Sequence, residues 1–340
     1  METIGVILLN LGGPDSLLAV KPFLYNLFSD RDIIRLGPPF LQRPIAWLIS
    51  RLRSKKTEGM YGMIGGKSPI LGITTAQAKA LETSLNSELR TPNSERAFKV
   101  YIGMRYWHPL IEDTIRQMHR DGIRRIIALS LYQHYSIATT GSAMSRFDDV
   151  IRQYTGMEST HISSWFSHKM YIEALVDVIK KGIESFTPSL TLPPRGGGLG
   201  GGDIHVLFSA HSLPMSIVES GDPYVNEIKG TIGEVLKKID IKWDLSYQSK
   251  SGPVRWLVPT TEEKIRELAG KGVGNLLVVP ISFVSDHIET LYEIDILYKG
   301  LADKLNIKLM RAESLNTSPL FIDALKDIIV MKIKGIGWQG

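Results

Sequence analysis

Short apolar runs rich in β-forming residues alternate with amphipathic stretches along almost the whole chain, and this alternation restricts the fold more than any other feature. The apolar runs cover residues 4–9, 98–102, 126–131, 206–208, 276–281 and 307–310. Strands separated by helical segments predict βαβ units, parallel sheets and a doubly wound α/β fold. A chain of 340 residues exceeds what one hydrophobic core usually serves, so we expect two lobes.

We place the lobe boundary near residue 165, which assigns residues 1–165 to an N-terminal lobe and 166–318 to a C-terminal lobe. The last segment, 319–340, begins with a helical pattern, and we expect it to pack back on the N-terminal lobe. Residues 187–202, TPSLTLPPRGGGLGGG, form a low-complexity stretch. Because such a stretch has no folding power of its own, we expect a surface loop within the second lobe.

Composition excludes several classes of protein. The chain has no cysteine, which excludes disulfides, a cysteine-ligated zinc site and an iron–sulfur cluster held by cysteine. A net charge of +5 indicates an anionic partner, but no nucleic-acid-binding module is present. No secretion signal pattern and no apolar run of about 18 residues is found, so we expect a cytoplasmic protein, soluble or peripherally attached to a membrane.

Residues 36–56, LGPPFLQRPIAWLISRLRSKK, combine large apolar side chains with a basic end. One interpretation is an apolar lip rimmed with positive charge, suited to a membrane interface or to an amphipathic ligand carrying carboxylates. The other is a helix that packs on the core and has a solvated basic end. Both interpretations remain open from this stretch alone.

A histidine follows one of the predicted strands in the sequence LFSAHSLPMSIVESGDPY. The run 205–208 is apolar enough for a strand buried on both faces, which places His211 on the loop that leaves it. Ligands of open α/β sheets bind in the crevice at the carboxyl ends of the strands. His211 is therefore a candidate for chemistry.

Three acids follow another predicted strand, in VSDHIETLYEIDILYKG. If a helix begins at Asp286, then Asp286, Glu289 and Glu293 share one face, and like charges at this spacing cost about 0.2–0.5 kcal/mol each. A capping box explains Asp286 and Glu289 but not Glu293, which indicates a cation or a proton path. His287 points away from Glu289 on a regular α-helix, and faces it only if the helix is locally widened.

Strand ends of the first lobe carry further polar and aromatic residues. NLGGPDS follows the first strand without the glycine pattern of a dinucleotide site, which disfavours an oxidoreductase. YIGMRYWHPL places Arg105 and Tyr106 after another strand, and LYQHYSIATTGSA supplies hydroxyl groups after a third. Together these segments predict a cleft with flat apolar walls, a basic entrance and a histidine facing acids.

Six motifs distributed over essentially the whole chain resemble the ferrochelatase family, whose members insert ferrous iron into a porphyrin. The motifs are, in order, LNLGGPDS, IGGKSPI, YIGMRYWHPL, LYQHYSIATTGSA, SAHSLPMSIVESGDPY and FVSDHIETLYEID. The resemblance implies two similar lobes, each a four-stranded parallel sheet flanked by helices, with the active-site cleft between them.

The same resemblance implies a role for each matching residue. His211 and Glu289 correspond to the catalytic pair at the point of metal insertion, and Asp286, His287 and Glu293 to a proton or metal path along a helix widened to π form. The residues that match porphyrin-binding positions are Leu11, which only packs; Arg53, Lys56 and Ser68, which hold propionates; and Arg105, Tyr106 and Trp165, which line the cleft.

The implied activity is that of a lyase inserting Fe(II) into protoporphyrin IX, with release of two protons, as the last step of haem biosynthesis. Fe(II) is then a substrate, and no tightly bound cofactor is expected. Three alternatives stay open: a ferrochelatase acting on coproporphyrin III, a related chelatase for cobalt or nickel, and a non-catalytic two-lobed protein that binds porphyrin or haem. Oligomeric state is not predicted.

Overall fold

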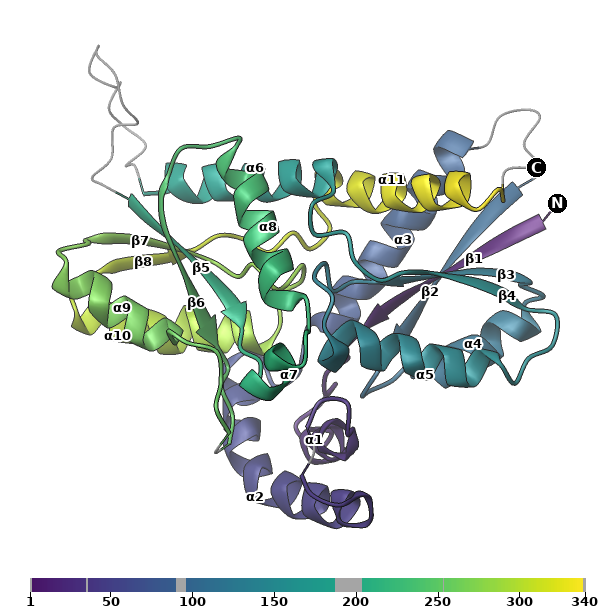
Figure 1. The fold of residues 1–340 in the computed structure, drawn as a ribbon, viewed down its shortest axis with the longest axis horizontal. Coiled ribbons are helices and arrows are strands. Elements are labelled where there is room, and N and C mark those ends of the chain that lie inside the picture. The colour runs from purple at the N-terminus through teal and green to yellow at the C-terminus, as the bar shows by residue number, and fades with distance from the viewer. Residues whose placement is uncertain (1, 35, 90–95, 187–203, 253, 339–340) are drawn as a thin grey trace.

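A computed structural model of the chain describes residues 2–34, 36–89, 96–186, 204–252 and 254–338. The predicted loop at 187–202, including its glycine-rich part 195–202, lies outside these residues. In the described part of the chain, two sheets stand side by side, and helices cover both faces of each (Figure 1).

The first sheet consists of four parallel strands in the order β2-β1-β3-β4. Its strands are β1 (Glu2–Asn10), β2 (Arg96–Met104), β3 (Arg125–Ser130) and β4 (Glu158–Ile162). The helical segments between its strands are α1 (Val20–Ser29), η1 (Pro39–Leu41), α2 (Gln42–Met63), α3 (Ile70–Leu89), α4 (Ile111–Arg120), η2 (Ile137–Gly141) and α5 (Ser142–Ile151).

The second sheet repeats this arrangement in the order β6-β5-β7-β8, again parallel. Its strands are β5 (Ile204–His211), β6 (Lys242–Gln248), β7 (Asn275–Val279) and β8 (Lys308–Arg311). The helices that accompany it are α6 (Lys169–Glu184), α7 (Met215–Glu219), α8 (Tyr224–Leu236), α9 (Thr261–Gly270), η3 (Glu289–Tyr298), α10 (Lys299–Lys304) and α11 (Pro319–Gly335). The predicted fold class, two similar α/β lobes, is confirmed.

Two strands, β4 and β6, were not among the apolar runs of the sequence. Their sequences are ESTHI and KWDLSYQ, and both strands lie at the edge of a sheet. An edge strand is partly exposed, so its residues need not be apolar on both faces. The sequence pattern therefore finds central strands better than edge strands.

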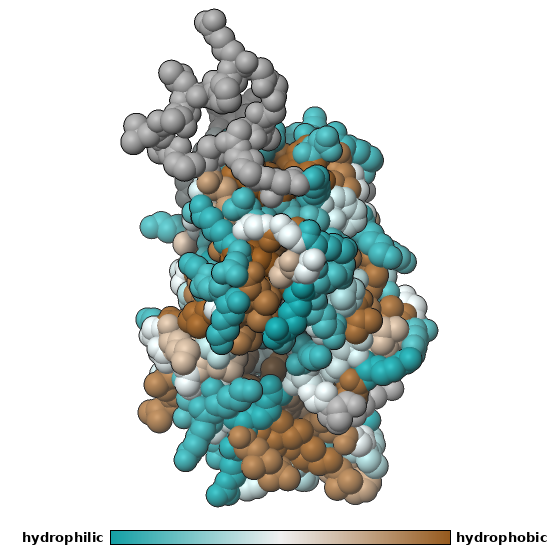
Figure 2. All heavy atoms as spheres, turned by 90° about the vertical axis from the view of Figure 1, so that its left-hand side faces the viewer, coloured by the Kyte–Doolittle hydropathy of each residue, from teal (hydrophilic) through white to brown (hydrophobic). Residues whose placement is uncertain are grey.

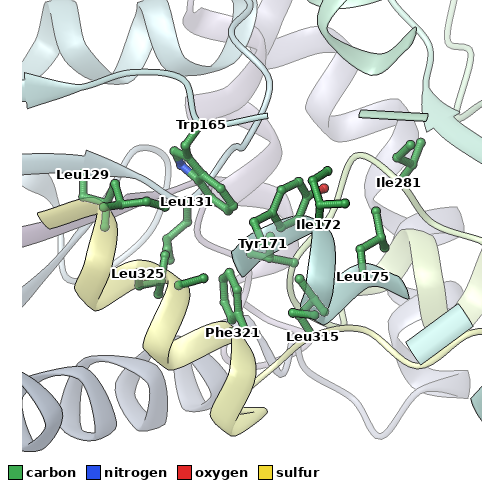
Figure 3. Packing of buried hydrophobic residues seen from close by; sticks show 14 of the residues in the cluster. Leu129, Leu131, Trp165, Tyr171, Ile172, Leu175, Ile281, Leu315, Phe321 and Leu325 are labelled. Carbon is green, nitrogen blue, oxygen red and sulfur yellow. The ribbon is translucent and has the colours of Figure 1, made fainter. Parts of the chain in front are cut away.

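The two lobes share one hydrophobic core. A single cluster of buried residues includes Val6 of β1, Phe208 of β5, Tyr171 of α6 and Phe321 of α11. Figure 3 shows α11 and α6 contributing side chains to this cluster from neighbouring positions. Helix α11 packs against both α3 and α6, and the end of the described chain reaches the first sheet, where the indole N–H of Trp338 donates to Glu158 of β4 at 3.2 Å (Figure 1).

Helix α2 presents large apolar side chains to solvent and small ones to the protein. Its buried positions include Ala46, Ser50 and Ser54. In contrast, Leu52 is 73% exposed and Phe40, just before the helix, is 76% exposed. Figure 2 shows apolar side chains gathered at the lower end of the molecule, where Figure 1 places α1 and α2. The helix thus packs on α1 and also carries an exposed apolar surface, so features of both sequence interpretations are present.

Candidate active site

A cavity of about 300 Å³ lies where the carboxyl ends of strands from both sheets approach helices α1 and α2. Leu11 follows β1, Tyr132 follows β3, and His211 is the last residue of β5. Ser249 follows β6, and Phe283 follows β7. Side chains from the two lobes therefore meet in one cavity, as expected for ligand sites at strand ends.

His211 and Glu289 form a close pair on the wall of this cavity. Nδ1 of His211 lies 2.8 Å from Oε2 of Glu289. The backbone of His211 is held by Ser282 and Tyr224, whose hydroxyl groups contact its N–H at 3.1 Å and its carbonyl at 3.0 Å. Burial disfavours the charged imidazole, but the Glu289 carboxylate outweighs this effect and raises the pKa of His211.

Ser249 connects Glu289 to a second carboxyl group. Its hydroxyl oxygen lies 2.7 Å from Oε2 of Glu289 and 2.6 Å from Oε2 of Glu293. Ser249 has a φ of 67°, in the left-handed region that non-glycine residues rarely adopt. Burial, reinforced by the charge of Glu289, raises the pKa of Glu293 to about 7. Burial acts in the same direction on Glu289, but His211 outweighs it and lowers the pKa of Glu289.

The helix that carries these acids is widened. Residues Glu289–Tyr298 form π-helix η3, so the widening implied by the family resemblance is observed. His287 precedes the helix and packs on Phe283 at a ring-centroid distance of 4.2 Å, and its Nε2 lies 4.0 Å from Oε1 of Glu289. Burial lowers the pKa of His287, which favours its neutral form.

Asp286 does not share the cavity face with Glu289 and Glu293, contrary to the prediction from helical spacing. The helix begins after Asp286, and the Asp286 carboxylate lies 2.9 Å from Nη1 of Arg311. Oδ1 of Asp286 also accepts hydrogen bonds from Ser314 and Thr290, while Oδ2 accepts one from Asn316. The carboxylate is thus fully engaged on the side of the helix that faces β8.

The predicted carboxylate-binding residues occupy different positions around the cavity. Arg53 and Ser68 line it, and Nη1 of Arg53 donates to the hydroxyl of Ser251 across the lobes at 2.5 Å. No carboxylate in the described part of the chain pairs with Arg53. Lys56 is exposed on α2 and does not line the cavity.

Three residues predicted to line the cleft lie behind its walls instead. Arg105 and Tyr106 both bind the carboxylate of Asp30, at 2.7 and 2.6 Å, and Tyr106 is only 2% exposed. Trp165 lies in the shared core, where its indole N–H donates to the carbonyl of Ser130 at 2.9 Å (Figure 3). Of the remaining predicted residues, Leu11 lines the cavity.

Some residues of the cavity were missed in the sequence. His134 was not among the predicted site residues, yet it lines the cavity, and burial lowers its pKa to about 3. The sequence could have indicated His134 as a site residue, because it follows the predicted strand that became β3. Ser249 follows β6, whose polar sequence hid the strand and therefore the strand end.

The described residues contain no group of three or more histidine, aspartate or glutamate side chains arranged to hold a metal ion. His211 and Glu289 are nevertheless an imidazole and a carboxylate side by side, which are two common ligand types for divalent transition metals.

Comparison with known proteins identifies relatives over the whole length of the chain. The model of the family described as "Ferrochelatase" matches residues 3–333. A ferrochelatase of Geobacter metallireducens is 48% identical over 96% of this chain and 98% of its own length. A ferrochelatase of Synechocystis is 45% identical over 97% of this chain and 82% of its own length.

Solved structures agree on the fold. SirB from Bacillus subtilis with Fe³⁺ aligns with a TM-score of 0.54, at 10% identity, over 100% of this chain and 98% of the other. The sirohydrochlorin chelatase of Bacillus subtilis subspecies spizizenii, in complex with cobalt, aligns with a TM-score of 0.53 at 12% identity. The motifs, the family model and the full-length relatives lead to the same result: the chain belongs to the ferrochelatase family.

Proposed function

We propose that this ferrochelatase inserts Fe(II) into protoporphyrin IX, forms protohaem and releases two protons, as the last step of haem biosynthesis. The observation that supports this most directly is the pair His211 and Glu289, 2.8 Å apart, on the wall of a largely apolar cavity between two lobes. A flat apolar ligand fits such walls, and the pair supplies both a proton acceptor and a negative charge.

The reaction requires metal binding to be coupled to proton removal. Two pyrrole N–H protons leave as the iron–nitrogen bonds form, and these protons are too weakly acidic to leave unaided at neutral pH. Because Nδ1 of His211 is engaged with Glu289, Nε2 is the ring nitrogen left to accept a proton from the macrocycle. Glu289 stabilises the imidazolium that results and offsets the charge of the incoming cation.

A route for protons continues from this pair to Glu293. The Ser249 hydroxyl lies within hydrogen-bond distance of both Glu289 and Glu293. A carboxyl group with a pKa of about 7 can bind and release a proton near neutral pH. Asp286 has no part in this route, because its carboxylate is committed to Arg311, Ser314 and Asn316.

The substrate's carboxylates bind at the mouth of the cavity in this proposal. Arg53 offers a guanidinium group without a carboxylate partner in the described residues, and Ser68 offers a hydroxyl group. Lys56 approaches the propionates only from the outer surface of α2. Apolar residues of α1 and its neighbours, including Leu27 and Phe28, favour protoporphyrin IX, whose vinyl groups are apolar, over coproporphyrin III, which has four carboxylates.

We also propose peripheral membrane contact through residues 36–56. The exposed apolar side chains of this segment, Phe40, Trp47, Leu48 and Leu52, surround the same end of the molecule as the cavity mouth. Arg51, whose guanidinium lies 5.5 Å from the Trp47 ring centroid, supplies positive charge for an anionic headgroup. No helix among the described residues is long and apolar enough to cross a membrane.

The decisive experiment is anaerobic insertion of Fe(II) or Zn(II) into protoporphyrin IX, followed by loss of free-porphyrin fluorescence. We expect the wild type to be active, and His211→Ala and Glu289→Gln to lose insertion while still binding porphyrin. His205→Ala is the matched control, because His205 lies on the same strand and pairs with a carboxylate, Asp244, at 3.0 Å outside the cavity.

Two results would contradict the proposal. Tight porphyrin binding by the wild type without insertion would indicate a non-catalytic porphyrin-binding protein. Faster insertion into coproporphyrin III than into protoporphyrin IX would assign the enzyme to the other substrate.

A further inference from the structure

The π-helix η3 needs an external support. A π-helix usually occurs as a single widened turn inside an α-helix, whereas η3 extends over ten residues. Contacts from outside the helix must therefore favour the wide form over a regular α-helix. Such contacts also decide where Glu289 and Glu293 project, since both residues lie on η3.

Arg311, the last residue of β8, makes contacts from outside the helix that can favour the π form. Its Nε and Nη2 donate to the two carboxylate oxygens of Asp295 at 2.8 and 2.9 Å. Its Nη1 donates to Asp286 at 2.9 Å. Asp295 is on the π-helix and Asp286 just precedes it. One guanidinium therefore binds a residue before Glu289 and a residue after Glu293. We call Asp286, Asp295 and Arg311 the clamp.

The arginine of the clamp is shielded from solvent, whereas the Asp295 side chain is 36% exposed, and neighbouring residues reinforce the contact with Asp286. The Arg311 side chain is only 12% exposed. Asn316 binds Asp286 twice, since its side-chain oxygen accepts from the Asp286 N–H at 3.0 Å and its amide donates to the carboxylate at 2.9 Å. A planar guanidinium with several fixed donors can hold two carboxylates in one geometry, which the single ammonium of a lysine does not reproduce.

We infer that Arg311 is a positioning residue for the metal-insertion reaction, because it holds η3 in the π form in which Glu289 meets His211. Arg311 does not line the cavity and acts only through the helix. The inference rests on the proposed function for its kinetic consequence, but its structural consequence can be tested independently.

The test compares Arg311→Lys and Asp295→Asn with the wild type. We expect each variant to lower kcat about 10- to 100-fold, the usual effect of removing a partner that orients a site residue. The KM for porphyrin should change by less than about twofold, because no group that contacts the porphyrin is altered. The double variant should be no slower than the worse single variant, because both substitutions break the same contact.

Arg146→Lys is the matched control for loss of a paired arginine. Arg146 also forms a two-pronged pair, with Glu112 at 2.6 and 3.4 Å, but it joins α4 and α5 away from the cavity. Because the Arg146 side chain is 39% exposed, this variant should lose less stability than Arg311→Lys, and it should keep its kcat. A kcat for Arg311→Lys equal to that of Arg146→Lys would overturn the inference.

Crystal structures of the Arg311→Lys and Asp295→Asn variants separate this inference from the proposed function. If the wild type inserts no metal, the proposed function fails, but the clamp still predicts that residues 289–298 relax toward an α-helix and that Glu289 moves away from His211. An unchanged π-helix in both variants would overturn the inference whatever the activity.

Discussion

At the scale of single residues, the site keeps two nearby carboxyl groups in different protonation states. Glu289 is ionised because His211 lies against it, whereas burial and the charge of Glu289 keep a proton on Glu293 up to a pH of about 7. Glu293 can therefore accept and release a proton near neutral pH. Its ionised form, however, lowers the stability of the folded protein.

The destabilisation caused by ionised Glu293 can be measured as a dependence of the free energy of unfolding on pH. The pKa of Glu293 rises from 4.5 to about 7 on folding, so between these values the folded state binds a proton that the unfolded state does not. The free energy of unfolding should therefore fall as pH rises from 4.5 through 7. Glu293→Gln lacks this ionisation, so it should gain stability relative to the wild type between pH 5 and pH 8. Urea unfolding of both proteins at pH 5 and pH 8 measures the gain. If the free energies of unfolding of variant and wild type differ by the same amount at both pH values, folding leaves the pKa of Glu293 unchanged.

The site residues that could be predicted from the sequence are those that lie at or after the end of a recognisable strand. His211 is the last residue of the apolar central strand β5, Glu289 comes after the central strand β7, and strand ends are where α/β proteins bind ligands. Trp165 was misplaced, because an aromatic residue beyond a strand end can as easily complete a core as line a cleft. Its ring packs on Phe321, which is far away in the sequence.

At the scale of elements, the width of η3 could not be derived from local sequence. The excess of acids showed that capping does not explain Glu293, but helix width follows from hydrogen bonding that the clamp imposes from β8. A tertiary contact of this kind overrides local preference, and only the family resemblance indicated the wide form.

The membrane contact proposed for residues 36–56 can be tested by substitution. Replacing Phe40 and Leu52 by asparagine should weaken binding to vesicles containing anionic lipid by about tenfold or more, since burying one large apolar side chain contributes about 1.5–3 kcal/mol. Flotation of protein with vesicles measures the change. Met331→Asn on α11 is the control, because Met331 is 57% exposed but lies on a different helix. Equal losses in both variants would argue against a specific membrane-binding surface.

At the scale of the whole molecule, the two lobes are held together by buried polar contacts as well as by the shared core. Gln133 of the first lobe donates to the carbonyl of Ile281 in the second at 2.5 Å, and Gln77 donates to Ser285 at 2.9 Å. Separating the lobes would exchange each of these hydrogen bonds for bonds to water, which costs about 0.5–1.5 kcal/mol per bond, and would also expose the shared core.

Shared packing of this kind predicts that the described lobes unfold together. Phe321 of α11 is fully buried between them and packs on Trp165, so Phe321→Ala should cost about 3–5 kcal/mol. The neighbouring Leu320 is 43% exposed, and Leu320→Ala should change stability by no more than about 0.5 kcal/mol. Tryptophan fluorescence and circular dichroism should give coincident urea transitions for the wild type and for Phe321→Ala, with the midpoint lower in the variant. Two separated transitions in the wild type would mean that each lobe is stable alone, and that the core between them contributes less than its continuity indicates.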